Sequence, residues 1–525
     1  MAEAGRKHAV LVGAGILCSR IFGLVRQRVF SHYFGLSDAA DVFSSALRVP
    51  NFLQNLFGEG VLSASFIPVY AGLLGRGNKE EAGRLAGAIA AILALIISII
   101  VAVGVLATPW LLWLIAPGYS GEKRELTILI VRILFPGTGI LVWSAWCLGI
   151  LNSHHKFFLS YVAPVVWNLS MIVTLLVFRH LPSDTLIVYL AWGTVLGCLL
   201  QFLVQLPSVL KLVPGMRFRL DLRSIHVRQV VGSFTSVAVG RGVVQISAFV
   251  DQAISTWLGR GAMAAMTTAS SINMLPISLF GMAVSAAELP TLSRMAGQEF
   301  DQATVAKLSS RLDSGLERIA FFVVPSAMAF FALGNVIVAA LYQSGEFTPA
   351  DSLYVWAILA GSGVGLLAST FGRLYSSTYY AMRDTRTPLR FALVRLAVTA
   401  VLGLASALLL PRLLGIDEKW GVVGLTASAG VAGWIEFYLL RRKMNRKLGP
   451  TGVPASIMLK LWSAAIIAAL IACTVEYVVP AQGPIVTAIY VLGVYGLVYF
   501  ALTFMLHIKE CEALFAKLVR RLGAR

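Results

Sequence analysis

The chain has 525 residues, of which 58% are hydrophobic and 13% are charged, and its net charge at pH 7 is +18. Soluble domains contain about 25% charged residues, so this composition excludes a soluble globular protein and indicates one that crosses a membrane many times. The apolar segments run unbroken for about 20 residues or more, whereas membrane β-strands alternate over about 10, so we expect an all-α polytopic membrane protein.

Breaks rich in charge, Gly or Pro divide the sequence into fourteen predicted transmembrane helices. Several exceed the roughly 20 residues that cross a bilayer, so they must tilt, kink or project from it. The predicted ranges are 8–35, 39–73, 84–116, 125–151, 158–179, 185–207, 229–258, 262–292, 318–343, 352–381, 388–411, 420–440, 457–479 and 485–506. The tail that follows, 508–525, has its apolar residues on one helical face, which predicts an amphipathic helix on the cytoplasmic membrane surface.

The distribution of Lys and Arg predicts how the chain is oriented. An even number of spans places both termini on one side, and most of the 43 Lys and Arg residues lie in the termini and loops of that side. The opposite loops contain only Lys123, Arg124, Arg179, Arg260, Arg412 and Lys419. The positive-inside rule therefore predicts a multi-pass protein of the cytoplasmic (inner) membrane with both termini cytoplasmic. We interpret the net charge as anchoring to anionic membrane lipids, and we expect no nucleic-acid partner.

Two pairs of similar segments indicate an internal duplication. "NLFGEGVLSASFIPVYA" (55–71) and "SLFGMAVSAAELPTLSRMA" (278–296) both read Phe-Gly and then Pro, and "APGYSGEKREL" (116–126) and "YQSGEFTPADS" (342–352) form corresponding external loops. Each offset is six helices, which predicts two parallel six-helix bundles plus two extra C-terminal helices. The expected divisions are an N-terminal bundle (1–210), a basic cytoplasmic linker (211–228), a C-terminal bundle (229–445), helices 13–14 (446–507) and the tail (508–525).

The motifs of several enzyme classes are missing from the sequence. There is no GxxxxGK[ST] or HExxH motif, the seven histidines form no cluster, and the five cysteines are scattered. We therefore predict no metal site, no cofactor and no enzymatic reaction, and any active transport must draw on an ion gradient or the membrane potential. Gly361 and Gly365 have the spacing of closely packed helices rather than that of a phosphate-binding loop.

Arginines inside the predicted spans are the strongest functional signal. The first span contains Arg20, Arg26 and Arg28 but no acid, although one arginine at mid-bilayer costs about 2.5–3.5 kcal/mol. On a helix, Arg20 and Arg26 lie about 120° apart and Arg26 and Arg28 about 160° apart, so the three cannot all face one cavity. The structural alternative is that each arginine reaches the interface or pairs with an acid, and Asp41, Glu59 and Asp251 are the candidate acids.

We favour an aqueous cleft that binds an anion. Arg20, Arg26 and Arg48 come from neighbouring helices of the first bundle, and Arg373 comes from the tenth span. The planar guanidinium group binds phosphate through two hydrogen bonds and stays charged when desolvated, so this set suits a pyrophosphate head group. Asp41 begins the second span near the external end of the first, and we expect it to pair with Arg26 or Arg28.

The stretch "SRIFGLVRQRVFSHYFGLSDAADVFSSALRVPNFLQNLFGEGVLSASFIPVYA" (19–71) closely resembles the opening signature of the MviN/MurJ family. It matches SR-x-x-G-x-x-R, FG-x-x-x-x-x-D and P-N-x-x-x-x-x-F-x-E-G-x-x-x-x-x-F-x-P in order. Weaker matches such as "LYQSGEFT" (341–348) and "YYAMRDTRTP" (379–388) extend the resemblance over nearly the whole chain. The family belongs to the MOP superfamily, which also holds MATE exporters.

The resemblance implies a fourteen-helix flippase that carries lipid II, an undecaprenyl-pyrophosphate-linked peptidoglycan precursor, to the outer leaflet by alternating access. It implies a substrate-binding cavity of Arg20, Arg26, Arg48 and Arg373, an external gate at Asp41, and the Glu-Gly pair of the second span at Glu59 and Gly60.

The eighth span departs from the family pattern. Family members usually carry Ala-Asp-Arg-Leu there, but Ser270 and Ser271 occupy the Asp and Arg positions, and Arg241 is the candidate replacement. The alternatives are therefore a flippase for another polyprenyl-pyrophosphate-linked glycan, a MATE-like ion-coupled exporter, or a scaffold that contacts cell-wall synthesis proteins. A cation exporter would favour acids in its cavity, and a scaffold leaves the buried arginines unexplained. The coupling ion, Na⁺ or H⁺, is not specified, and Asp251 is the one acid near a possible Na⁺ site.

Overall fold

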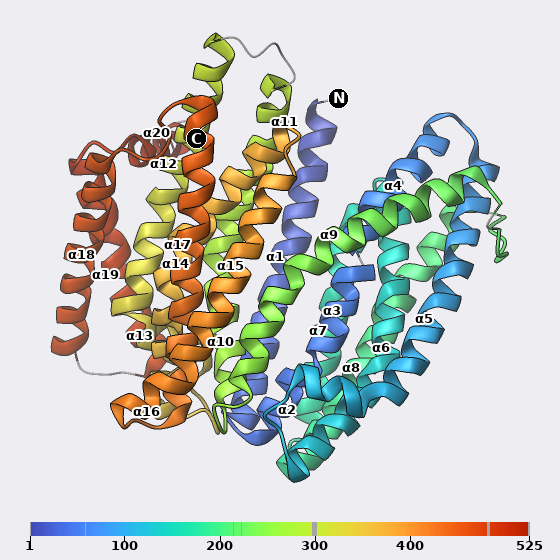
Figure 1. The fold of residues 1–525 in the computed structure, drawn as a ribbon, viewed down its shortest axis with the longest axis horizontal. Coiled ribbons are helices and arrows are strands. Elements are labelled where there is room, and N and C mark those ends of the chain that lie inside the picture. The colour runs from blue at the N-terminus through green and yellow to red at the C-terminus, as the bar shows by residue number, and fades with distance from the viewer. Residues whose placement is uncertain are drawn as a thin grey trace. The chain divides into compact units, whose positions relative to one another are not determined.

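The computed structural model describes residues 2–57, 59–213, 215–221, 223–296, 302–479 and 483–522. Within these residues the regular elements are helices, labelled in Figure 1. The chain forms two compact units. Unit 1 consists of Met1–Ala264 with Ser344–Phe347, and unit 2 consists of Ala265–Gln343 with Thr348–Arg525.

Unit 1 is built around a long, largely buried helix, α6. Its helices are α1 (Ala2–Phe34), α2 (Asp38–Ala46), α3 (Arg48–Phe57), α4 (Glu59–Gly75), α5 (Lys79–Ile115), α6 (Gly121–Ser153), α7 (Phe157–Val177), α8 (Ser183–Leu212) and α9 (Ile225–Ser255). Helix α6 packs against α8, α5, α4 and α2, with Phe135 and Trp146 buried in the core. A buried hydrogen bond of 2.9 Å from Gln201 to Ser144 satisfies polar groups that lipid could not.

The second predicted span is broken into three helices, and this break positions the candidate site. Ser37 caps α2 by accepting a hydrogen bond from the backbone of Ala40, and α2 ends at Ala46. A new helix, α3, then begins at Arg48 and ends at Phe57. Asp41 and Arg48 therefore lie on two short helices rather than on one continuous span.

Unit 2 contains the remaining helices. They are α10 (Ala262–Pro276), which begins in unit 1, the π-helix η1 (Ile277–Met282), α11 (Ala283–Ala296), α12 (Gln302–Ala332), α13 (Gly334–Tyr342), α14 (Pro349–Ala381), α15 (Arg386–Leu404), η2 (Ala405–Leu409), α16 (Leu410–Leu414), η3 (Glu418–Trp420), α17 (Gly421–Leu448), α18 (Ala455–Val478), α19 (Pro484–Met505) and α20 (Lys509–Leu522). Helices α14 and α17 cross closely, since a Cβ on Gly365 would lie 2.5 Å from the Cα of Gly430. The predicted close packing at Gly361 and Gly365 is confirmed.

The turn between α14 and α15 is held by Asp384. Its carboxylate accepts hydrogen bonds from the hydroxyl of Thr387 (2.8 Å) and the ammonium group of Lys447 (3.2 Å). Burial tends to raise the pKa of Asp384, but the hydrogen bonds from Thr387 and Lys447 outweigh it and lower that pKa below its usual value.

Each of the fourteen predicted spans coincides with a helix or a run of consecutive helices. In the described part of the chain, eleven helices are long and apolar enough to cross a membrane. An all-helical, multi-pass membrane protein is therefore confirmed, and the count of fourteen crossings stays a prediction. Helix α9 packs against α4 and α5 of unit 1, so the compact units divide after α9. The predicted division at residues 211–228 stays a prediction.

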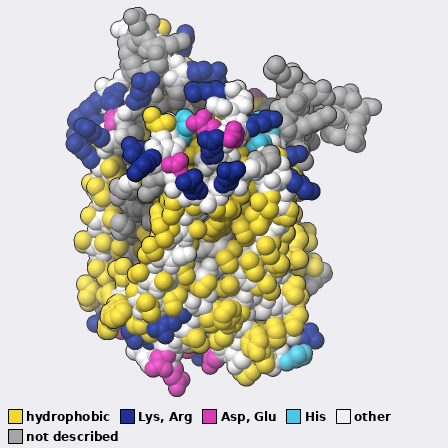
Figure 2. All heavy atoms as spheres, turned by 90° about the vertical axis from the view of Figure 1, so that its right-hand side faces the viewer, with side chains coloured by type: hydrophobic (Ala, Val, Ile, Leu, Met, Phe, Trp, Pro, Cys, Tyr) yellow, Lys and Arg dark blue, Asp and Glu magenta, His cyan; other side chains and the backbone are white. Residues whose placement is uncertain are grey.

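The surface is that of a membrane protein. On the face shown in Figure 2, apolar side chains form a broad band, and most of the visible Lys and Arg side chains lie at one end of it. Helix α5 exposes Leu95, Ile99, Val103 and Leu106 along one helical face. At the C-terminus, the predicted tail forms α20, where Phe515 packs 5.2 Å from the ring of Phe504.

Candidate functional site

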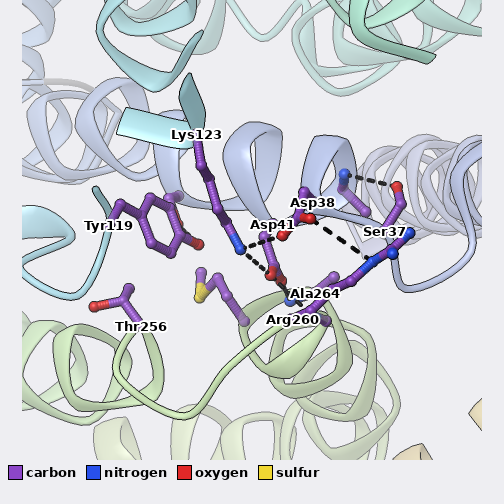
Figure 3. A network of polar contacts seen from close by, with 12 residues as sticks. Ser37, Asp38, Asp41, Tyr119, Lys123, Thr256, Arg260 and Ala264 are labelled. Atoms are coloured by element: carbon purple, nitrogen blue, oxygen red, sulfur yellow. Dashed lines mark hydrogen bonds and ion pairs between the residues drawn. The ribbon is translucent and has the colours of Figure 1, made fainter. Parts of the chain in front are cut away.

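A buried carboxylate lies at the centre of a polar network in unit 1 (Figure 3). Asp41 on α2 has no solvent exposure, and its Oδ2 lies 2.7 Å from the Nζ of Lys123 on α6. The same ammonium group contacts Asp38 at 2.7 Å, and the exposed Arg260 lies 3.7 Å from the second oxygen of Asp38. The two acids of α2 therefore connect this helix to α6 through Lys123 and to the α9–α10 loop through Arg260.

Backbone amides complete the coordination of Asp41. The N–H of Gly261 donates to its Oδ2 at 2.8 Å, and the N–H of Ala264 donates to its Oδ1 at 2.9 Å. Ala264 lies in the first turn of α10, where backbone N–H groups have no helical partner and the helix dipole favours a negative charge. The Asp41 carboxylate therefore fastens the start of α10 to α2.

Two loops with similar sequences make reciprocal contacts nearby. In "APGY" (116–119), the N–H of Gly118 donates to the hydroxyl of Thr256, just after α9, at 3.1 Å. In the loop before α14, the N–H of Glu346 donates to the carbonyl of His32, near the end of α1, at 2.9 Å. Because α1 and α9 are the first and seventh predicted spans, these matched contacts are those expected of a duplicated architecture.

Arg48 lies behind this network and is almost fully buried. One of its N–H groups approaches the sulfur of Met263, while its Nε and Nη1 have no hydrogen-bond partner among the described residues. The ionisable groups whose charges act on it are Tyr119 and Asp41. Tyr119 in turn shares a 2.9 Å hydrogen bond with Ser45, and Lys123 lies 4.5 Å above its ring. Burying a guanidinium group with unpaired donors is energetically unfavourable, and an anionic ligand that accepts hydrogen bonds from these donors would remove that cost.

The three arginines of α1 differ in burial. Arg20 is exposed and Arg28 is partly buried. Arg26 is also partly buried, and its guanidinium group lies 5.3 Å from the ring centre of Trp167 on α7. The predicted pairing of Asp41 with Arg26 or Arg28 is wrong in this structure, because the partners of its carboxylate among the described residues are Lys123, Gly261 and Ala264.

The other predicted site residues are placed less completely. Arg373 is exposed on α14 of unit 2, and Asp251 is partly buried on α9 of unit 1. The side chains of Glu59 and Arg241 lie outside the described residues. Ser271, at the position of the expected eighth-span arginine, shares a 2.9 Å hydrogen bond with Tyr342 in unit 2.

Lys123 is the member of this network that was not predicted to belong to the site. It was available as a signal, because it is one of the few cations in the external loops and it lies within the repeated "APGYSGEKREL" loop (116–126). A separate cavity of about 610 Å³ lies between the α6–α7 turn and the end of α8, lined by Lys156, Phe158 and Lys211 among others. It contains none of the predicted site residues.

The comparisons with known proteins agree on one family. Residues 30–500 match the family model described as Lipid II flippase MurJ. A probable lipid II flippase MurJ of Rhizobium tropici is 31% identical over 434 residues, which cover 82% of this chain and 79% of that protein. The lipid II flippase MurJ of Burkholderia cenocepacia is 30% identical over 441 residues, which cover 82% of each chain.

Solved structures give the same fold. A lipid II flippase MurJ in an inward closed conformation matches with a TM-score of 0.78 and 23% identity, over 95% of this chain and 99% of that one. An inward-facing MATE transporter of the MOP superfamily matches with a TM-score of 0.65 and 20% identity, over 82% of this chain and 95% of that one. With a family model that covers most of its length and curated relatives that are 30–31% identical, the chain belongs to the lipid II flippase MurJ family.

Proposed function

We propose that this protein moves lipid II, an undecaprenyl-pyrophosphate-linked peptidoglycan precursor, from the inner to the outer leaflet of the cytoplasmic membrane. The family match over residues 30–500 is the observation that carries this proposal, because the curated relatives are named for that activity. The arginines within the helices supply the chemistry that a pyrophosphate head group requires.

We further propose that transport proceeds by alternating access and that the Asp41 network is the closed external gate. Opening would separate α2 from the start of α10 and break the contacts of Asp41 with Lys123, Gly261 and Ala264. Arg48, buried directly behind the network, would then become accessible to an anion. Its unpartnered N–H groups favour binding of the pyrophosphate over the empty closed state.

Orientation and energy source complete the proposal. The charge distribution supports cytoplasmic termini, which puts the Asp41 end of unit 1 on the external side. Because the sequence has no nucleotide-binding loop, the cycle would be driven by the membrane potential or by an ion gradient of Na⁺ or H⁺. Cell-wall synthesis proteins are the expected partners.

The second candidate is an ion-coupled exporter, since the fold is shared with MATE transporters. An exporter of organic cations would need acids facing its substrate. In unit 1 the buried acid Asp41 is instead neutralised by Lys123, while the buried Arg48 has no acid within salt-bridge distance among the described residues. This charge pattern favours an anionic substrate.

Complementation tests the proposal. A host depleted of its own lipid II flippase would receive this protein, and externally added probe would report lipid II in the outer leaflet of intact cells. We expect rescue by the wild type, loss of rescue with Arg26→Ala, and retained rescue with Arg412→Ala, which removes an exposed ion pair. Failure of a correctly inserted wild type to restore labelling would refute transport of lipid II.

A second variant tests the role of the guanidinium group itself. Arg48→Lys keeps the charge but loses the planar pair of donors that binds phosphate. We expect reduced transport at equal expression. Full transport by Arg48→Lys would mean that only the charge matters at this position.

A further inference from the structure

Unit 2 contains a second group of charged residues, Arg373, Arg395 and Glu436. Arg395 on α15 donates from Nη1 to the Oε2 of Glu436 on α17 at 3.2 Å. The Arg395 side chain is 36% exposed and that of Glu436 is 15% exposed. Arg395 uses one of its five guanidinium N–H groups in this contact, which is a single hydrogen bond rather than a bidentate pair.

Arg373 on α14 lies at the same level as this pair. Its flanking residues Phe371 and Tyr375 both contact the ring of Phe437, which follows Glu436, with ring centres 5.6 Å apart in each case. Arg395 and Glu436 are accordingly the charged groups whose electrostatic fields act on Arg373. Arg395 is therefore paired with Glu436, Arg373 lies within the electrostatic reach of both, and the three groups have a net charge of about +1.

The depth of the cluster argues for water around it. Helix α14 ends at Ala381 and α15 begins at Arg386, so Arg373 and Arg395 both lie about 12–14 Å along their helices from the connecting turn. Arg373 is exposed at this depth. An exposed arginine inside a membrane-spanning segment faces a water-filled space rather than lipid, because the lipid-facing position costs several kcal/mol.

We propose that Arg373 and Arg395 together bind a phosphate group of the lipid-linked pyrophosphate, and that Glu436 is their counter-charge when the site is empty. This inference rests on the proposed function and adds Arg395 to the substrate-binding residues. Arg395 has donors to spare, since its Nε is buried without a partner among the described residues. It also supplies the second cation in unit 2 that Ser271, already bonded to Tyr342, does not provide.

An ion pair kept only for structure would behave differently. Arg395→Gln and Glu436→Gln both break the same contact, so a structural pair would lose thermal stability in both variants and change ligand binding in neither. A phosphate site separates the two variants, because only Arg395→Gln removes a ligand of the phosphate. Glu436→Gln removes an acid that competes for Arg395 and leaves both arginines in place.

Binding of farnesyl pyrophosphate to the purified full-length protein in detergent tests this proposal, with farnesyl monophosphate as the comparison probe. Relative to the wild type, we expect about tenfold weaker pyrophosphate binding for Arg395→Gln, the loss typical of one charged hydrogen-bonding partner. We expect Glu436→Gln to bind at least as tightly as the wild type. Arg412→Gln is the matched control, because it removes another arginine–glutamate pair of unit 2 at an exposed position.

Thermal unfolding of each variant distinguishes lost binding from lost folding. If Arg395→Gln does not fold, Arg395→Lys replaces it, and we expect severalfold weaker binding because the paired donors are lost. Wild-type affinity in a folded Arg395 variant would overturn this inference and leave the proposed function standing. Absence of pyrophosphate binding by the wild type would overturn both.

Discussion

Removing Lys123 should release the closure at Asp41. In Lys123→Met, the fully buried Asp41 carboxylate keeps its two backbone N–H donors but loses the ammonium group 2.7 Å away. Loss of one partner of a buried ion pair costs about 3–5 kcal/mol, and the remaining amides favour the lower end of that range. Since about 1.4 kcal/mol is a factor of ten, the equilibrium between closed and open forms should shift about 100-fold towards the open form.

Cysteine labelling measures this shift. Ala264 is 3% exposed and donates its N–H to Asp41, so an Ala264→Cys thiol is protected while the network holds. In purified protein lacking its native cysteines, we expect Lys123→Met to raise the maleimide labelling rate of that thiol by one to two orders of magnitude. Lys419→Met, which breaks an exposed pair with Asp417, should leave the rate unchanged. Equal rates with and without Lys123 would refute the idea that this ion pair holds the closure.

Three further predictions follow from other parts of the structure. Arg48→Met replaces a buried, incompletely bonded cation by an apolar side chain of similar length. It should therefore raise the free energy of unfolding by about 1–3 kcal/mol while abolishing transport. A lower thermal midpoint would contradict this. Gly118→Ala places a methyl group 2.2 Å from the carbonyl oxygen of Thr256, so it should lower the thermal midpoint, whereas Gly72→Ala, with open space around it, should not. The lowered pKa of Asp384 means that its carboxylate stabilises the fold above its unfolded pKa of about 3.9 and that this contribution is lost as pH falls through the lower folded pKa. The wild type should therefore unfold at a higher temperature than Asp384→Asn near pH 7. The difference should disappear in strong acid, where the carboxylate is protonated, and a difference that persists there would argue against this role.

Hydropathy was sufficient to predict the helices of this protein, because a chain in lipid must satisfy its backbone within each span. It could not predict the breaks within them. The second predicted span divides into α2, α3 and α4, and the eighth contains the π-helix η1, which includes Phe280 and Gly281 of the repeated Phe-Gly motif. Hydropathy averaged over a span is insensitive to such local changes in helical geometry.

The candidate site was predicted only in part, because contacts between residues distant in sequence depend on tertiary packing. Asp41 and Arg48 were predicted as site residues, and both are buried. The predicted partner of Asp41, however, was a neighbouring arginine on α1. Proximity along the chain favoured Arg26 and Arg28, whereas tertiary packing brought in Lys123 from α6. The contact between Arg395 and Glu436 was missed similarly, because 41 positions separate its partners.

Lipid II translocation by the purified protein is the most direct test of the proposed function. Vesicles containing the full-length chain and fluorescent lipid II would be treated with a membrane-impermeant quencher, and the fluorescence of the inner leaflet would be followed over time. We expect the wild type to move the protected lipid to the quencher, and Arg48→Ala to leave it protected. Protection that is equal with the wild type, with Arg48→Ala and in protein-free vesicles would contradict the proposed function.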